Sequence, residues 1–80
     1  MHRAVMNRIN EVIGLILMTN GEALKDSDNA NSIENWDSVT HIVLLTAIEE
    51  EFGFKFSDEQ MENISTIGEI RKAASEKVKT

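Results

Sequence analysis

The chain has 80 residues, no cysteine and a formal net charge of −6 at pH 7. This length leaves room for one small core, so we expect residues 1–80 to form a single domain. The absence of cysteine excludes disulfides, thiolate metal sites and a cysteine nucleophile, and any thiol chemistry would have to be supplied by a cofactor.

Acidic side chains are concentrated in the middle of the chain. Between Glu22 and Glu69 there are twelve Asp or Glu residues and two basic ones, Lys25 and Lys55. Such a surface repels nucleic acid and favours partners with basic docking patches. The N-terminal segment lacks signal-peptide features, and no apolar run approaches the ~20 residues that span a bilayer. We therefore expect a monomeric cytoplasmic protein that does not bind nucleic acid or insert into membranes.

The first third of the sequence predicts a helix followed by a long loop. Apolar residues from Val5 to Leu17 follow the spacing of an amphipathic helix, and Asn20-Gly21 is expected to end this segment. Residues 22–37 are rich in Asp, Asn and Ser, which favour loops. A connection of this length is often functional. It contains three apolar residues expected to anchor it to the core, namely Leu24, Ile33 and Trp36.

The remainder predicts three further helices and no sheet. A second helix is expected to be capped by Asp37 or Ser38 and to run through Phe52. Capping-box spacings at Ser57 and Thr66 open a brief third helix and a final fourth one. We predict an all-α fold, a small four-helix bundle of three longer helices and one short helix, with the long loop between the first two.

Two familiar kinds of site are poorly supported. Ser38 and His41 lie one helical turn apart, a spacing that suggests a nucleophile and its base. Neighbours on one helix rarely align in this way and no oxyanion hole is suggested, so we predict no catalytic residue and place His41 at a surface boundary near Ser38. The loop from Asp26 to Asp37 faintly resembles a calcium loop, but Asn31 replaces the required glycine and the bidentate glutamate is missing. We predict no metal site.

Ser38 itself is the best candidate for a functional residue. Its simplest role is a helix N-cap, which contributes about 1 kcal/mol. An anion esterified to this hydroxyl would also lie at the positive end of a helix dipole, close to backbone N–H groups. The position is therefore suited to carrying a phosphate.

The chain resembles the acyl carrier protein family, whose signature Asp-Ser-Leu opens the second helix and reads Asp37-Ser38-Val39 here. The similarity continues through residues 47–53, 56–59 and 66–70. It implies that a phosphopantetheinyl transferase attaches 4′-phosphopantetheine from coenzyme A to Ser38. The cofactor thiol would then carry acyl groups as thioesters for fatty-acid, polyketide or other specialised synthesis. The chain would not be an enzyme, and its other partners would be acyl-loading and acyl-processing enzymes with basic docking patches.

The resemblance also implies two sets of residues around Ser38. Thr40 and Val43 stand where many fatty-acid carriers have acidic residues, which favours a carrier dedicated to one pathway. Partner binding is expected at Asp37, Val39, Val43, Thr46, Glu49 and Glu50. An acyl chain would be sheltered by residues that could equally be plain core, namely Ile42, Leu45, Ile48, Phe52 and Ile64.

Two alternatives stay open. An aminoacyl or peptidyl carrier would share Ser38 but load an amino acid, and the acidic run Glu49-Glu50-Glu51 favours the acyl version over it. An unmodified helical protein-interaction module would use Ser38 only as a cap.

Overall fold

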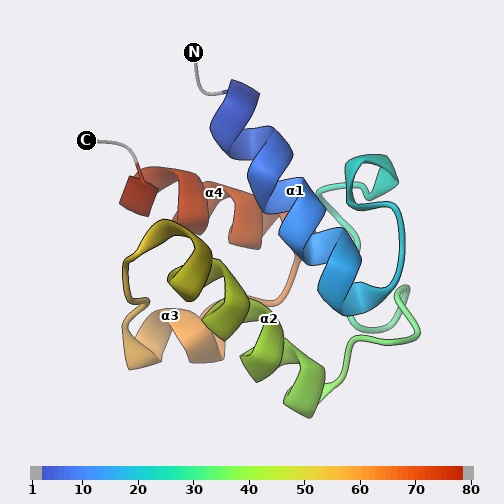
Figure 1. Cartoon of the computed structure of the whole chain (residues 1–80). Helices are drawn as coiled ribbons and strands as arrows, with labels where there is room; N and C mark the ends of the chain where they lie inside the picture. Colours follow the sequence, from blue (N-terminus) through green and yellow to red (C-terminus); the bar gives the residue numbers. More distant parts are fainter. Residues whose placement is uncertain (1–2, 79–80) are drawn as a thin grey trace.

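The computed structural model describes residues 3–78, which form four α-helices and one 3₁₀ turn (Figure 1). The predicted all-α class, with three longer helices, one short helix and a long loop between the first two, is confirmed. Asn29 and Thr66 form an isolated β-bridge, and no strand occurs within the described residues. The elements are α1 (Arg3–Leu17), η1 (Gly21–Ala23), α2 (Ser38–Phe52), α3 (Asp58–Asn63) and α4 (Ile67–Val78).

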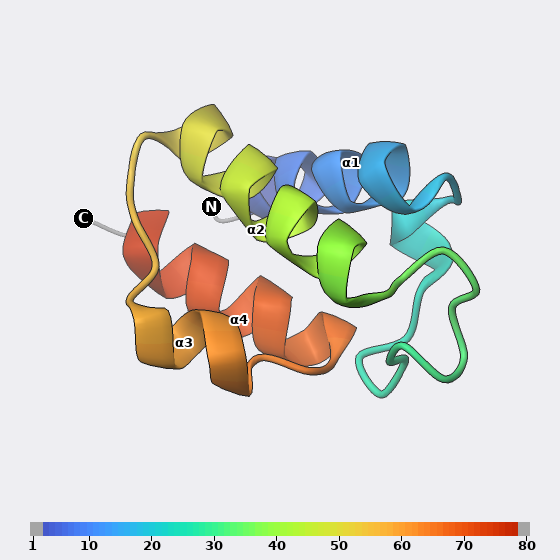
Figure 2. The same ribbon diagram turned by 90° about the horizontal axis from the view of Figure 1, so that it is seen from below.

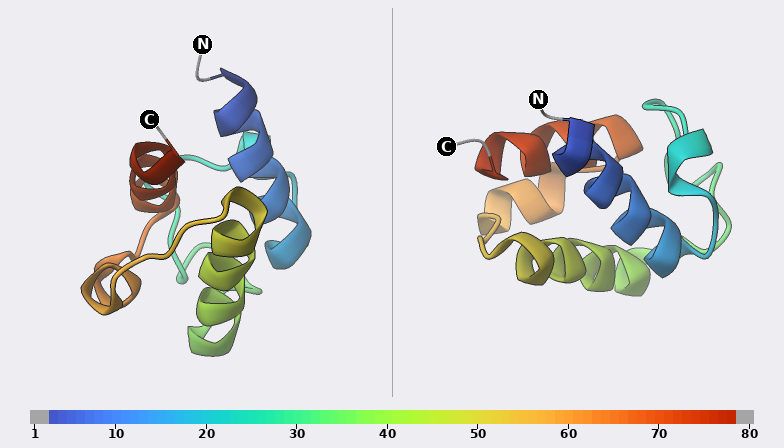
Figure 3. Two further views of the ribbon diagram at one scale, coloured as in Figure 1. Left: turned by 60° about the vertical axis from the view of Figure 1, so that its left-hand side comes forward. Right: turned by 45° about the horizontal axis from the view of Figure 1, so that its top comes forward.

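The helices share one apolar core, to which α1, α2 and α4 all contribute buried residues. Helix α1 packs against both α2 and α4, and the two views of Figure 3 show α3 lying beyond α2 and α4. The long loop passes the ends of α1 and α2 before it enters α2 (Figure 2). Its predicted anchors are confirmed, since Ile33 and Trp36 are buried and Leu24 packs against the core in a partly buried position.

Helix α1 ends before Asn20-Gly21, the pair at which the sequence predicts its end. The helix stops at Leu17, and Met18 takes the left-handed conformation with φ 60°. Gly21 is needed for a different reason, because a Cβ at this position would overlap the carbonyl oxygen of Asn10. The expectation that Asn20-Gly21 ends the helix is therefore wrong, and the glycine marks a close approach between η1 and α1.

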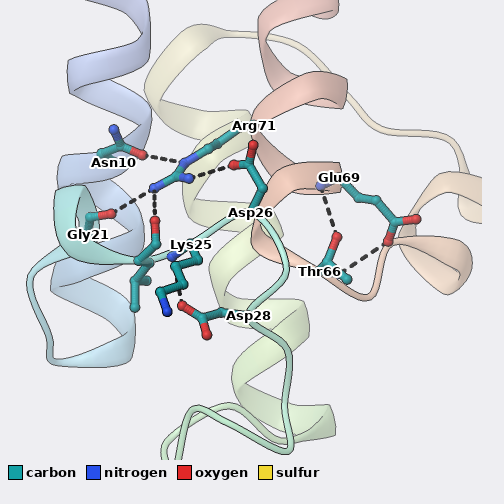
Figure 4. Close-up of polar contacts among 9 residues, drawn as sticks. Asn10, Gly21, Lys25, Asp26, Asp28, Thr66, Glu69 and Arg71 are labelled. Atoms are coloured by element: carbon teal, nitrogen blue, oxygen red, sulfur yellow. Dashed lines mark hydrogen bonds and ion pairs between the residues drawn. The ribbon is translucent and has the colours of Figure 1, made fainter.

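Arg71 of α4 fastens the loop to the bundle (Figure 4). Only 14% of its side chain is exposed, and all three guanidinium nitrogens donate hydrogen bonds to the loop or to α1. Because a charged donor serves several acceptors at once, these bonds are stronger than neutral ones. The acceptors are Asn10 Oδ1 at 2.8 Å, Asp26 Oδ1 at 2.7 Å, Gly21 O at 2.9 Å and Leu24 O at 3.0 Å.

The loop also provides hydrogen-bond acceptors for N–H groups in the first turn of α4. The N–H groups of Ile67 and Gly68 donate to the carbonyl oxygens of Asp28 and Asp26, both at 2.9 Å. The predicted capping box is present as well, because Thr66 Oγ1 accepts from the Glu69 N–H while Glu69 Oε1 accepts from the Thr66 N–H (Figure 4). The first half of the loop is thus tied both to α1 and to α4.

Candidate functional site

Ser38 is the first residue of α2, and its side chain is exposed. The helix is capped by Asp37, whose Oδ1 accepts the Thr40 N–H at 2.8 Å. This hydrogen bond lowers the pKa of Asp37, because it stabilises the ionised carboxylate. Ser38 is therefore not the helix cap, which was one of the two roles considered for it. Its hydroxyl lies at the start of the helix and does not take part in capping.

The residues before Ser38 are held by hydrogen bonds to other parts of the fold. Asn35 Nδ2 donates to the carbonyl oxygen of Leu17 at 3.0 Å, which fastens the segment to the end of α1. The backbone N–H of Trp36 donates to Ile33 O at 3.1 Å, and its indole is buried with 4% exposed. The serine is thus exposed while the backbone that presents it is fixed, which is what a partner enzyme needs from a modification site.

His41 is engaged through both ring nitrogens. The indole Nε1 of Trp36 donates to His41 Nδ1 at 3.1 Å, and His41 Nε2 lies 2.9 Å from the carbonyl oxygen of Met61 in α3. An indole N–H can only donate, so Nδ1 accepts and Nε2 carries the proton. Because neither nitrogen is directed at the hydroxyl of Ser38, the arrangement does not support a nucleophile-and-base pair. His41 is half-buried, as its predicted boundary position requires.

A hollow of about 250 Å³ adjoins Ser38. It lies between the long loop, the start of α2 and α3, and it opens to solvent. Its walls combine apolar surface from the loop and α3 with carboxylates at the rim. They are formed by Ala30, Trp36, Asp37, Ser38, His41, Glu62, Ile64 and Ser65.

The first turns of α2 carry an exposed apolar surface. Val39 and Val43 are exposed, in agreement with the uncharged surface expected there. Ile42 was expected to line an acyl pocket, but 50% of it is exposed and it lies on this surface instead. That expectation is wrong because apolar residues surround much of α2, so their spacing does not identify the buried face. We call Val39, Ile42 and Val43 the apolar face of α2.

Glu49 was expected on the docking surface, but it is buried, with 6% exposed. Its Oε2 accepts the Phe56 N–H at 2.7 Å, so the carboxylate holds the connection between α2 and α3. The expectation of an exposed Glu49 is therefore wrong. Glu51 is also committed within the fold, because Arg8 of α1 donates to both of its carboxylate oxygens at 2.7 and 2.9 Å. Glu50 and Glu51 are both exposed, and Glu51 is held by its pair with Arg8.

The other candidate pocket residues belong to the core. Leu45 and Ile48 are fully buried, Ile64 is buried, and Phe52 packs against the core in a partly buried position. Ile64 alone among them lines the hollow beside Ser38. Thr46, expected at the docking surface, is partly buried.

The acidic loop does not form a metal centre. Asp26 binds Arg71, and Asp28 accepts the Lys25 N–H at 2.7 Å and the Ser32 hydroxyl at 3.2 Å. Within residues 3–78, no three His, Asp or Glu side chains gather in a group that could hold a metal ion. In the same part of the chain, none of the helices has both the length and the hydropathy needed to cross a bilayer.

Comparison with known proteins identifies the class of protein to which this site belongs. A family model described as "Phosphopantetheine attachment site" matches residues 4–73. The acyl carrier protein of Wolinella succinogenes is 31% identical over 67 residues, which cover 84% of this chain and 88% of the relative. The acyl carrier protein of Coprothermobacter proteolyticus is 39% identical over 49 residues, which cover 61% of this chain and 58% of that relative.

The fold and these matches define a phosphopantetheine-binding helical domain. More particularly, the chain belongs to the acyl carrier protein family, and its cofactor is 4′-phosphopantetheine. Members of this family are carriers and not catalysts.

Proposed function

We propose that the chain is an acyl carrier and that Ser38 is the residue to which 4′-phosphopantetheine is attached. The observation that carries this proposal is an exposed hydroxyl at the first residue of α2, on a backbone held by its neighbours. When bound, the cofactor supplies the thiol on which an acyl group is carried as a thioester. The chain has no cysteine of its own, which agrees with a thiol supplied by the cofactor.

The surroundings of Ser38 suit a phosphate ester. The N-terminal end of α2 carries the positive end of the helix dipole, and N–H groups of a first helical turn lack partners within the helix. The carboxylate of Asp37 is directed toward the Thr40 N–H, from which it accepts a hydrogen bond. The hollow beside Ser38 offers the apolar surface of Trp36 and Ile64 to whatever lies along it.

Mass spectrometry tests the attachment site. The protein is incubated with coenzyme A, magnesium and a broad-specificity phosphopantetheinyl transferase, and the mass gained by the intact chain is measured. We expect one phosphopantetheine on the wild type and on Ser27→Ala, a matched change at an exposed loop serine, and none on Ser38→Ala. No gain by the wild type would refute the carrier function, while an equal gain by Ser38→Ala would refute the site.

Partner enzymes are proposed to dock on the apolar face of α2 and on the charges at its two ends. The exposed apolar side chains lie within two turns of Ser38, Asp37 precedes them and Glu50 follows. A partner that fits this surface has an apolar patch with basic residues at its rim. The transferase and the acyl-loading and acyl-processing enzymes are the partners that a carrier requires. Thr46 contributes only its exposed part.

The acyl character and a dedicated pathway are also part of this proposal. Both relatives named above are acyl carrier proteins, which favours an acyl group over an amino acid as the cargo. Thr40 and Val43 stand where many fatty-acid carriers have acidic residues, which favours a specialised acyl pathway over general fatty-acid synthesis.

Kinetics of the transfer reaction test the docking surface. We expect Val43→Ser to raise the KM for the carrier several-fold with little dependence on salt, because its contacts are apolar. Glu50→Gln should raise KM at low salt and lose that effect at high salt. Glu51→Gln is the matched control, since its carboxylate is bound to Arg8. If Glu51→Gln changed KM as much as Glu50→Gln, the assignment of the docking charge would be wrong.

A further inference from the structure

His41 joins three segments that surround Ser38. Its Nδ1 accepts from the buried indole of Trp36 in the loop, and its Nε2 donates to the Met61 carbonyl oxygen in α3. The ring centroids of Trp36 and His41 are 5.9 Å apart and their planes differ by 17°. This is the geometry of an N–H···N bond lying in both ring planes, not of face-to-face stacking.

Helix α3 depends on few contacts for its position. It has six residues and none of them is buried, although Met61 packs against the core in a partly buried position. Elements with few buried apolar contacts are the first to open in a native protein. The two ends of α3 are anchored by the buried Phe56 and Ile64, and the bond from His41 to Met61 adds a hold between them.

The two bonds of His41 flank the hollow beside Ser38. Trp36 and His41 both line it, and Glu62 and Ile64 extend its wall immediately after Met61. A change at His41 would move the loop wall and the α3 wall together, since it is the residue that contacts both.

We propose that His41 is a positioning residue that fixes Trp36 and α3 on opposite sides of the hollow and so sets how far a group carried on Ser38 is shielded from water. This inference rests on the proposed attachment at Ser38. In this role His41 takes no part in the chemistry of loading. It acts through Trp36 and α3 and not on the reacting atoms.

Both bonds require the neutral imidazole with its proton on Nε2. Once Nδ1 is protonated it can no longer accept from the indole, while the bond to Met61 persists. The charged residues that line the hollow together with this ring are Asp37, just before α2, and Glu62 of α3, and the loop contributes the uncharged Ala30 and Trp36. Acidification should therefore release the Trp36 wall first.

The unloaded protein provides the first test, because the chain has a single tryptophan. The indole N–H resonance of Trp36 and the ring resonances of His41 are followed by NMR as the pH is lowered. We expect the indole resonance to change wherever the His41 ring resonances change, together with a rise in acrylamide quenching of Trp36 fluorescence. An indole resonance that stays constant while the ring resonances of His41 change would overturn the proposal.

Variants separate positioning from general destabilisation. We expect His41→Leu to speed hydrogen exchange of the α3 amides about tenfold, the loss of one hydrogen bond of ordinary strength. His41→Gln supplies an acceptor and a donor and should restore most of the protection without any dependence on pH. Trp36→Phe keeps an aromatic ring, loses the donor and should free only the loop wall. If His41→Leu does not fold, the wild-type titration and Trp36→Phe still decide the matter.

The loaded protein provides the functional test. Octanoyl-coenzyme A and the transferase load the chain, the added mass is verified, and the thioester is cleaved with hydroxylamine. We expect cleavage to be several-fold faster in His41→Leu than in the wild type, and near the wild-type rate in His41→Gln. Equal rates in all three would overturn the shielding role although loading succeeded. Failure of the wild type to load would refute the attachment proposal instead, and the tests on the unloaded chain would still judge the position of α3.

Discussion

Among residues with some exposure to solvent, Arg71 is the one whose substitution we expect to lower the stability of the fold most. We consider Arg71→Met, which keeps an unbranched apolar stem and removes the guanidinium. The substitution leaves the carbonyl oxygens of Gly21 and Leu24 and the amide oxygen of Asn10 without their charged donor. These acceptors are buried or partly buried, so their loss is not fully compensated by water.

The magnitude follows from the exposure of each partner. The ion pair with Asp26 contributes less than about 1 kcal/mol, because 77% of the Asp26 side chain is exposed. The other bonds, to a donor only 14% exposed, each contribute about 1.5 kcal/mol or more before water replaces part of them. We therefore expect Arg71→Met to lower the free energy of unfolding by about 3 kcal/mol. For a chain of this size that is a large share of the total stability.

Urea unfolding followed by Trp36 fluorescence and by circular dichroism measures this loss. Arg8→Met is the matched control, because Arg8 is 43% exposed and its ion pairs with Glu11 and Glu51 lie on the surface. It should cost less than about 1 kcal/mol. Equal destabilisation by the two substitutions would show that Arg71 is an ordinary surface cation and that the loop is held by its apolar anchors alone.

Three further outcomes can be checked in the same unfolding assay. Glu49→Leu should destabilise by about 2 kcal/mol, because it leaves a buried backbone N–H without an acceptor, whereas Glu49→Gln should lose less than half of that. The folded-state pKa of Asp37 is lowered, so its contribution to stability is present above the ordinary value of 3.8 and is lost as the pH falls through the folded-state value. Asp37→Asn should accordingly lose less stability than the wild type between pH 5 and pH 2. Gly21→Ala should destabilise by more than 2 kcal/mol, because the added methyl group overlaps a carbonyl oxygen of α1.

The features that the sequence predicts well are local ones. The capping boxes at Ser57 and Thr66 are both formed, and α2 begins after Asp37 and ends at Phe52 as expected. A cap depends on residues three positions apart, so its signal is complete within a short window. The loop anchor Trp36 is predictable for a similar reason, because a large apolar side chain in a polar loop has few other places to go.

The features that it misses depend on contacts between distant segments. Arg71 bonds to residues 45 to 61 positions away, and its own neighbourhood resembles any amphipathic helix. Glu49 is expected to be exposed because a charge at a helix end normally is, and only the folded position of Phe56 provides a buried donor. Ile42 is misplaced because α2 is apolar around much of its circumference, so that packing and not periodicity decides its buried face.

These corrections change how the carrier is expected to meet its partners. Two of the three glutamates at the end of α2 have partners within the chain, which explains their place at a helix end that disfavours negative charge. Glu49 accepts a buried backbone N–H, and Glu51 pairs with Arg8 at the surface. Less charge is therefore available there for long-range steering, and the surface beside Ser38 is apolar. Because apolar contacts act at short range and charges act over about a Debye length, we expect partners of this chain to be selected by shape at the apolar face of α2 more than by electrostatic attraction. A partner enzyme suited to an acidic second helix should consequently recognise this carrier poorly.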